Sequence, residues 1–290
     1  MQLLRGGWGF SGMLKLYAFV VGCLVCSGVQ GAEAWVLKDW MVDGLRREAL
    51  VHVPEVKAGE RMPLVFAFHG HGGNMRNATR SFRMDEVWPE ALVVCMQGVP
   101  TPGRLTDPEG KKNGWQSGAG DQGDRDLKFF DAVFATMKAE HVVDEDRVYA
   151  MGHSNGGGFT YLLWAERGEL FAAMGPSGSA ARQSLGSLKP KPVIHVAGEG
   201  DPLVKYSWQK SMMEALRVLN QCGPGEAWDQ DANCTLYPSA IGVPVVTAIH
   251  PGGHEYPKGA PGVIAKFFKQ HRRVAAGTAT VSGSAAKSGS

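Results

Sequence analysis

The stretch "VYAMGHSNGGGFT", residues 148–160, places Ser154 in a Gly-x-Ser-x-Gly pattern directly after an apolar, strand-like run. Glycine loses more backbone entropy on folding than other residues, so a cluster of glycines indicates that the chain needs close approach or an unusual backbone conformation there. The residues that follow, "FTYLLWAE" (159–166), are compatible with a helix. A serine on a sharp strand-to-helix turn has its hydroxyl lifted out of a sheet. The stretch therefore predicts Ser154 as a nucleophile; the alternative is a glycine-rich connector.

The rest of the chain alternates between two patterns. Continuous apolar runs bounded by turn residues predict strands that are covered on both faces, as in parallel sheets. Between them, apolar residues recur at helical spacing. Strands that alternate with helices predict one α/β domain with a doubly wound, mostly parallel sheet flanked by helices. The apolar runs are 63–70, 91–98, 147–152, 191–198 and 244–250, an alternating strand at 46–53 follows the hairpin signal Asp43-Gly44, and the helical patterns are 127–137, 208–219 and 263–268.

The N-terminus has the layout of a secretory signal peptide. Arg5 and Lys15 precede an apolar run at 16–26, and small residues follow it up to residue 31. A run of this length is too short to span a bilayer. We therefore expect residues 1–31 to be a leader and the protein to be secreted, with a lipoprotein anchor at Cys23 as a minor alternative. Residues 33–274 form the expected catalytic domain, and 275–290, small and polar, a disordered tail.

The charge balance limits the classes of binding partner that we expect, and the cysteines bear on whether a disulfide forms. Removal of the leader takes away two basic residues and leaves equal numbers of basic and acidic residues, so neither nucleic acid nor a membrane surface is expected as a partner. Three cysteines remain, and Cys95 lies in an apolar run that reads as a buried strand. An oxidising compartment permits a bridge between Cys222 and Cys234, which would close a loop of 13 residues; the alternative is that all three thiols stay free.

A nucleophilic serine needs a base, and the base needs a carboxylate that orients it. In the chain order Ser, acid, His, the acid is expected just after a later strand, where Asp201 lies, with Glu199 as the competitor. The base is expected after the last strand. His254 lies there in a glycine-rich loop, and His250 is the alternative.

The oxyanion of an acyl-transfer intermediate needs two backbone N–H donors. One is expected from Asn155, the residue after the serine. The other is expected from His71 in the loop "HGHGGN", because Gly70, Gly72 and Gly73 let that backbone approach a ligand closely. No spacing in the sequence fits a metal site, and no cofactor is expected.

Taken in order, the segments "RREALVHVPE", "PLVFAFHGHGGN", "DRVYAMGHSNGGGFTYLL", "HVAGEGDPLVKY" and "PGGHEYP" resemble the polyhydroxybutyrate depolymerase and feruloyl esterase group of the α/β-hydrolases. These are secreted serine esterases akin to carbohydrate esterase family 1. The resemblance covers nearly all of residues 42–270. It implies an α/β-hydrolase fold, a triad of Ser154, Asp201 and His254, and a Cys222–Cys234 disulfide.

Two departures from the family bear on the substrate. Relatives commonly have a tryptophan two residues after the catalytic histidine, where this chain has Tyr256. The segment 101–125 is an excursion that we expect to border the cleft through Trp115. Trp115 and Tyr256 are therefore the candidate substrate-binding residues.

The expected function is a secreted serine carboxylesterase that hydrolyses feruloyl or acetyl type esters on plant polysaccharide through an acyl-enzyme. The alternative prediction is a polyhydroxybutyrate depolymerase, although the short tail supplies no module for adsorption to an insoluble polyester. Other acyl esters and a peptide bond are further alternatives. A non-catalytic glycan-binding protein on a hydrolase scaffold is a different class, and it predicts that Ser154 does not react with a fluorophosphonate.

Overall fold

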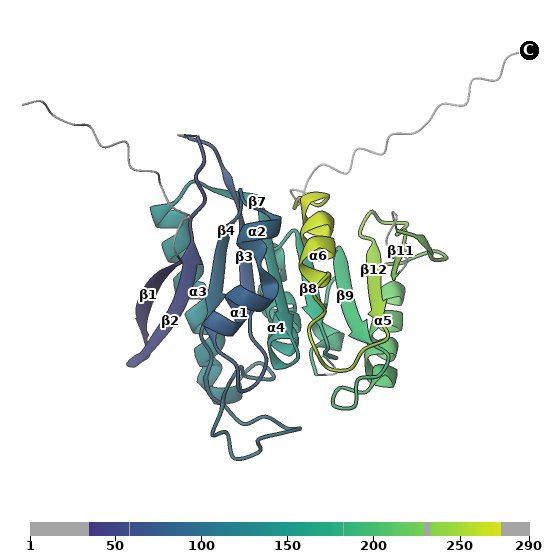
Figure 1. The fold of residues 1–290 in the computed structure, drawn as a ribbon, viewed down its shortest axis with the longest axis horizontal. Coiled ribbons are helices and arrows are strands. Elements are labelled where there is room, and N and C mark those ends of the chain that lie inside the picture. The colour runs from purple at the N-terminus through teal and green to yellow at the C-terminus, as the bar shows by residue number, and fades with distance from the viewer. Residues whose placement is uncertain (1–34, 58, 182, 229–232, 274–290) are drawn as a thin grey trace, which may run out of the picture. The chain divides into compact units, whose positions relative to one another are not determined.

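A computed structural model describes residues 35–57, 59–181, 183–228 and 233–273 (Figure 1). The expected leader 1–31, the lipoprotein alternative at Cys23 and the expected tail 275–290 lie outside these residues. Their assignments stay predictions.

Ten of the described strands form one large mixed sheet in the order β1-β2-β4-β3-β7-β8-β9-β12-β11-β10 (Figure 1). The six strands from β4 to β12 in this order pair in parallel, and antiparallel strands flank them at both edges. A separate two-stranded sheet joins β5 to β6. The strands are β1 Val36–Val42, β2 Leu45–His52, β3 Met62–Phe68, β4 Leu92–Met96, β5 Val99–Pro100, β6 Asn113–Gly114, β7 Val143–His153, β8 Ala173–Ser177, β9 Val193–Gly198, β10 Glu226–Ala227, β11 Cys234–Tyr237 and β12 Val245–His250.

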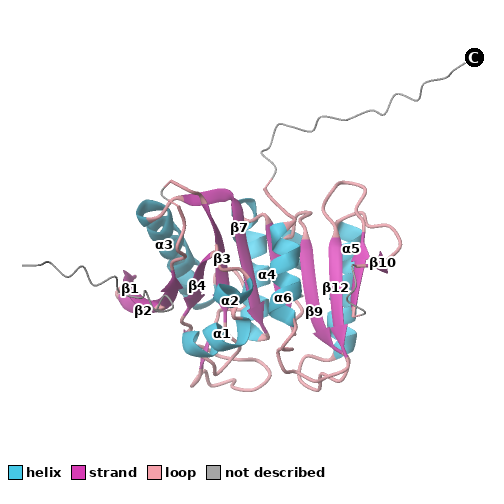
Figure 2. Ribbon diagram, turned by 45° about the horizontal axis from the view of Figure 1, so that its top comes forward, coloured by secondary structure: helices cyan, strands magenta, loops and turns pink. Residues whose placement is uncertain are grey.

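Helices cover both faces of the sheet (Figure 2). Side chains from α3, α4 and α5 pack into one apolar core with the sheet, and side chains from α1, α2 and α6 pack into a second core on the opposite face. Covering both faces explains why the parallel strands β3 and β4 are apolar at every position and fully buried, and why β9 is buried along its whole length, with His195 as its one polar side chain. The α-helices are α1 Met75–Phe82, α2 Met84–Val87, α3 Arg125–Glu140, α4 Asn155–Arg167, α5 Tyr206–Leu219 and α6 Ala260–Lys269.

Most elements expected from the sequence are confirmed. The Asp43-Gly44 hairpin joins β1 to β2, and both turn residues have positive φ. Strand β8 was not anticipated, because Gly175 and Pro176 within "AMGPS" read as turn residues. A larger residue would crowd α6 there, since a Cβ on Gly175 would lie 3.0 Å from the Phe268 ring.

The expected Cys222–Cys234 disulfide is wrong. The segment that begins at Cys222 folds back as an antiparallel hairpin, in which Cys222 lies opposite Ser239 and Trp228 lies beside Cys234. Ser239 is five residues beyond Cys234, which is about 16 Å of extended chain. A disulfide needs Cα atoms within about 7 Å, so the strand register keeps these two cysteines unbridged. The loop closure is instead provided by backbone hydrogen bonds.

Candidate active site

Ser154 lies at the junction of β7 and α4, in a backbone conformation that an ordinary residue avoids. Its φ is 59° and its ψ is −120°, which is a strained combination for a residue with a Cβ. The chain around it is held very close to β3: a Cβ on Gly156 would lie 2.1 Å from the backbone oxygen of Phe68, so only glycine fits. The side chain of Ser154 is partly exposed. The strand-to-helix turn expected from the sequence is therefore formed, and it presents a hydroxyl to solvent.

Three polar side chains far apart in the sequence meet at this turn. The Ser154 hydroxyl donates to Nε2 of His254 at 2.7 Å, and Nδ1–H of His254 donates to Oδ2 of Asp201 at 2.7 Å. The Asp201 side chain is buried, while 21% of the His254 side chain is exposed. An imidazole placed in this way can take a proton from the hydroxyl while the carboxylate holds the correct tautomer.

Asp201 follows β9 and is oriented by its own loop. Its Oδ1 accepts the backbone N–H groups of Leu203 and Val204, both at 2.9 Å. The competitor Glu199 is exposed to solvent. The alternative base His250 ends β12, and its backbone oxygen accepts the N–H of Glu199. The structure thus brings Asp201 and His254, rather than Glu199 and His250, to the serine.

His153 is a site residue that the sequence analysis did not single out. Its Nε2–H donates to the backbone oxygen of His254 at 2.8 Å, and its Nδ1 accepts from the Ser177 hydroxyl at 3.1 Å. Burial, with a smaller contribution from the nearby His254, lowers the pKa of His153 to about 4, so the ring is neutral near pH 7. Its place inside the Gly-x-Ser-x-Gly pattern was the available signal, but its contact with a residue 101 positions away could not be read from the chain.

The loop after β3 lies against the nucleophile turn. A Cβ on Gly70 would approach both Ser154 Cβ and the His153 backbone oxygen to 3.5 Å, so the next residue, His71, is close to the serine. Asn155 is the first residue of α4, and an N–H at that position has no partner within its own helix. Both positions are compatible with the expected oxyanion donors, whose role stays a prediction.

The excursion 101–125 packs onto this loop, but Trp115 does not border the cleft. Its side chain is fully buried, stacks on Phe159 with ring centroids 5.1 Å apart, and donates from Nε1 to the backbone oxygen of His69 at 2.9 Å. The expected contact of the Trp115 side chain with substrate is therefore wrong. Trp115 instead supports the site from beneath, since its backbone N–H and C=O pair with the side-chain amide of Asn155, next to Ser154.

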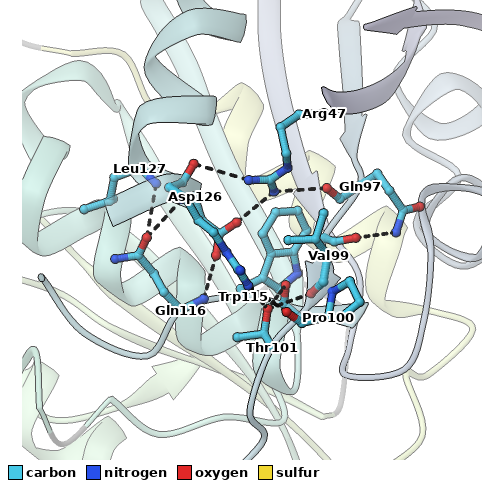
Figure 3. Close-up of polar contacts among 12 residues, drawn as sticks. Arg47, Gln97, Val99, Pro100, Thr101, Trp115, Gln116, Asp126 and Leu127 are labelled. Atoms are coloured by element: carbon cyan, nitrogen blue, oxygen red, sulfur yellow. Dashed lines mark hydrogen bonds and ion pairs between the residues drawn. The ribbon is translucent and has the colours of Figure 1, made fainter. Parts of the chain in front are cut away.

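A buried polar network holds the segment that carries Trp115 (Figure 3). Arg47 of β2 and Asp126 of α3 form an ion pair at 2.7 Å, and both side chains are fully buried. The second oxygen of Asp126 accepts the backbone N–H of Gln116, whose side-chain oxygen accepts the N–H of Asp126 in return. Arg47 also donates to the backbone oxygen of Gln97. This reciprocal pairing fixes the excursion to the sheet.

A second contact ties the excursion to the loop after β3. His71 Nε2 lies 3.1 Å from Asp107 Oδ2, and that oxygen also accepts the backbone N–H of Lys112. The His71 ring is packed against Gly103 and Gly114, where a Cβ would lie within 3 Å of ring atoms. The side chain of His71 thus anchors the excursion to the loop after β3.

The ring of Tyr256 packs against His153, the residue that holds the backbone of the base. Its ring makes edge-to-face contacts with Phe82 at 4.8 Å and His153 at 5.6 Å between centroids. The hydroxyl is buried, and burial raises its pKa; it has no hydrogen-bond partner among the described residues. A substrate contact by Tyr256 stays a prediction.

Within the described ranges, no group of three or more His, Cys, Asp or Glu side chains is arranged to hold a metal ion. Across the same residues, no helix combines the length and apolar character needed to cross a membrane.

The doubly wound sheet, the strained turn and the Ser–His–Asp hydrogen-bond chain define a class: the protein is a serine hydrolase with the α/β-hydrolase fold. Comparison with known proteins agrees. The profile of the prolyl oligopeptidase family matches residues 109–181. A probable feruloyl esterase C of Aspergillus clavatus is 27% identical over 71% of this chain and 76% of its own length.

Two further relatives add detail. The bifunctional acetylxylan esterase/xylanase XynS20E of Neocallimastix patriciarum is 30% identical over 40% of this chain and 18% of its own length. A solved structure of a ferulic acid esterase superposes with a TM-score of 0.59 at 14% identity, covering 82% of this chain and 98% of that one. The chain is thus similar to feruloyl esterases in sequence and to esterases in fold, and its site is that of a serine carboxylic ester hydrolase.

Proposed function

We propose that the chain hydrolyses feruloyl or acetyl type esters carried by plant polysaccharide, with Ser154 as nucleophile, His254 as general base and acid, and Asp201 as the residue that orients His254. One observation carries the assignment of roles: the two 2.7 Å hydrogen bonds that link Ser154 to His254 and His254 to Asp201 at a partly exposed turn. The substrate class is supported by two relatives, a probable feruloyl esterase and a bifunctional acetylxylan esterase/xylanase.

In the proposed reaction, Ser154 Oγ attacks the ester carbonyl carbon while its proton passes to His254 Nε2. The backbone N–H groups of Asn155 and His71 donate to the oxyanion of the tetrahedral intermediate. The intermediate collapses as the carbon–oxygen bond to the alcohol breaks, and the alcohol leaves with the proton from His254. Water then gives a proton to His254 and attacks the acyl-enzyme, which releases the acid and restores Ser154.

The neighbourhood of the base supports this assignment. His153 holds the backbone of His254 and is neutral near pH 7, so it places no competing positive charge beside the imidazole. Asp201 is buried and accepts hydrogen bonds on both oxygens, which keeps its orientation fixed during the proton transfers.

Export of the chain, with a leader at 1–31 and a catalytic domain at 33–274, is part of the same proposal. It is supported by the charged, apolar and small-residue order of the N-terminus. A polysaccharide-linked ester is a large substrate that is met outside the cell.

Fluorophosphonate labelling followed by substrate comparison tests the proposal. Wild-type protein is expected to be labelled at Ser154, with labelling abolished in Ser154→Ala and strongly weakened in His254→Ala. Release of ferulate from methyl ferulate and of acetate from acetylated xylan is then compared with clearing of a polyhydroxybutyrate film and cleavage of a peptide substrate. Clearing or peptide cleavage without release of ferulate or acetate would refute the substrate class, and absence of labelling would refute the catalytic roles.

A further inference from the structure

Three polar side chains that are not part of the Ser–His–Asp chain lie in line behind Asp201. They are Gln209 of α5, His195 of β9 and Tyr161 of α4, and none of the three side chains is accessible to solvent. Gln209 Nε2 lies 3.0 Å from Asp201 Oδ2, Gln209 Oε1 lies 3.5 Å from His195 Nε2, and His195 Nδ1 lies 2.7 Å from the Tyr161 hydroxyl. Buried polar groups are costly unless they are paired, so this line needs an explanation.

The orientation of the Gln209 amide follows from its neighbours. Its nitrogen faces two acceptors, Asp201 Oδ2 and the backbone oxygen of Val204 at 2.7 Å. A flipped amide would set oxygen against both of these oxygens. The nitrogen therefore donates both its hydrogens, and the amide oxygen faces His195.

The tautomer of His195 follows in turn. Facing the Gln209 oxygen, His195 Nε2 carries the proton, so Nδ1 is the acceptor for the Tyr161 hydroxyl. Burial lowers the pKa of His195 to about 4 and raises the pKa of Tyr161, so both side chains are neutral near pH 7. Every hydrogen bond in the line is therefore donated in the direction of Asp201.

We propose that Gln209, His195 and Tyr161 are positioning residues that aim the Asp201 carboxylate at His254. Oδ1 of Asp201 is saturated by two backbone N–H groups, and Oδ2 is shared between Gln209 and His254. With Gln209 on one side of Oδ2, the remaining lone pair is directed to His254 Nδ1. This inference rests on the proposed function, because it assigns a role relative to the proposed base.

The primary test is Gln209→Met, which keeps the side-chain length and removes the donors. Asn220→Leu is the matched control, because Asn220 is an equally buried amide that caps the other end of α5, and its side chain bonds to backbone groups of Lys191 and Val243 rather than to the Asp201 loop. Both variants are expected to lose thermal stability. Only Gln209→Met is expected to lower kcat about tenfold with KM unchanged, as for the loss of one hydrogen bond to a charged group.

Tyr161→Phe is the milder second variant, and it tests the positioning role if Gln209→Met does not fold. It keeps the ring and removes only the donor to His195, so a two- to threefold loss of kcat with KM unchanged is expected. Wild-type kcat in the folded Gln209 and Tyr161 variants, or a change in KM alone, would overturn the proposal.

A measurement without substrate separates this inference from the proposed function. The proton resonance of His254 Nδ1–H is expected to shift in Gln209→Met and Tyr161→Phe and to stay in place in Asn220→Leu. A resonance that is the same in all four proteins overturns the positioning role. Absence of fluorophosphonate labelling in the wild type would count against the proposed function alone.

Discussion

His153 and His254 are joined by a hydrogen bond of 2.8 Å, from the ring Nε2–H of the first to the backbone oxygen of the second. The residue immediately before the nucleophile thus holds the loop that carries the base. The strained turn and the base loop are positioned as one unit, so the distance from Ser154 to His254 does not depend on the base loop alone. Neutral His153 is required, because its Nδ1 accepts from Ser177.

Acid is expected to destabilise the fold through three buried histidines. Burial lowers the pKa values of His69, His153 and His195 from 6.5 to about 4. Between these values the unfolded chain binds protons that the folded chain excludes, so stability is lost as the pH falls from 6.5 towards 4. Each histidine contributes on the order of 3 kcal/mol over this range. Urea unfolding at pH 7 and pH 4.5 measures the effect; equal stability at both would contradict the neutral, buried state of these rings.

Asp201→Asn is expected to lower kcat by a factor of about 10³ to 10⁴, because the amide no longer holds His254 in the tautomer that accepts from Ser154. Glu199→Gln is the matched control: this carboxylate is two residues away, exposed, and expected to leave kcat unchanged. Steady-state kinetics on methyl ferulate or another accepted ester measures both. If the Glu199 variant were the inactive one, the acid would have to be reassigned.

Two glycines on α4 are expected to respond oppositely to alanine. Gly156→Ala would place a Cβ 2.1 Å from the Phe68 backbone oxygen, so the elbow must shift, with loss of stability and activity. Gly158→Ala meets nothing within 4 Å, and it should stabilise the helix by about 0.5–1 kcal/mol. Thermal melts of both variants test this, and a destabilised Gly158→Ala would show that the space around α4 is less open.

Breaking the buried Arg47–Asp126 pair is expected to be costly. Asp126→Asn leaves a buried guanidinium without its counter-charge, and a loss of about 3–5 kcal/mol is expected. The exposed pair of Asp43 and Lys128 offers the comparison, since Asp43→Asn should leave stability unchanged. Chemical denaturation measures both variants. Similar results for the two would mean that solvent reaches the Arg47 network.

Reducing agent is expected to leave the melting temperature of the protein unchanged. The register of the hairpin keeps Cys222 and Cys234 apart, whereas a closed bridge over this loop would contribute about 3 kcal/mol. Melting with and without dithiothreitol tests the point, and mass spectrometry after alkylation counts the thiols. A lower melting temperature under reduction would show that the two cysteines do form a disulfide.

Part of the site was predictable because its signals are local. The glycines around Ser154 mark a turn whose crowding is set by neighbouring backbone, and the order of serine, acid and histidine follows the ends of successive strands. Gln209 and His195 carried no such signal. A buried glutamine in an amphipathic helix looks like any polar position until the sheet brings Asp201 beside it.

The sequence by itself determined the class of fold and the three side chains that meet, because apolar runs, glycine clusters and loop positions act over a few residues. The tertiary structure decided the rest. It buried Trp115 beneath the site, separated Cys222 from Cys234 through strand register, and set His153 and Gln209 against the backbone and carboxylate that they hold. These outcomes depend on contacts between distant segments, whose geometry is set only when the sheet and its two helical layers pack together.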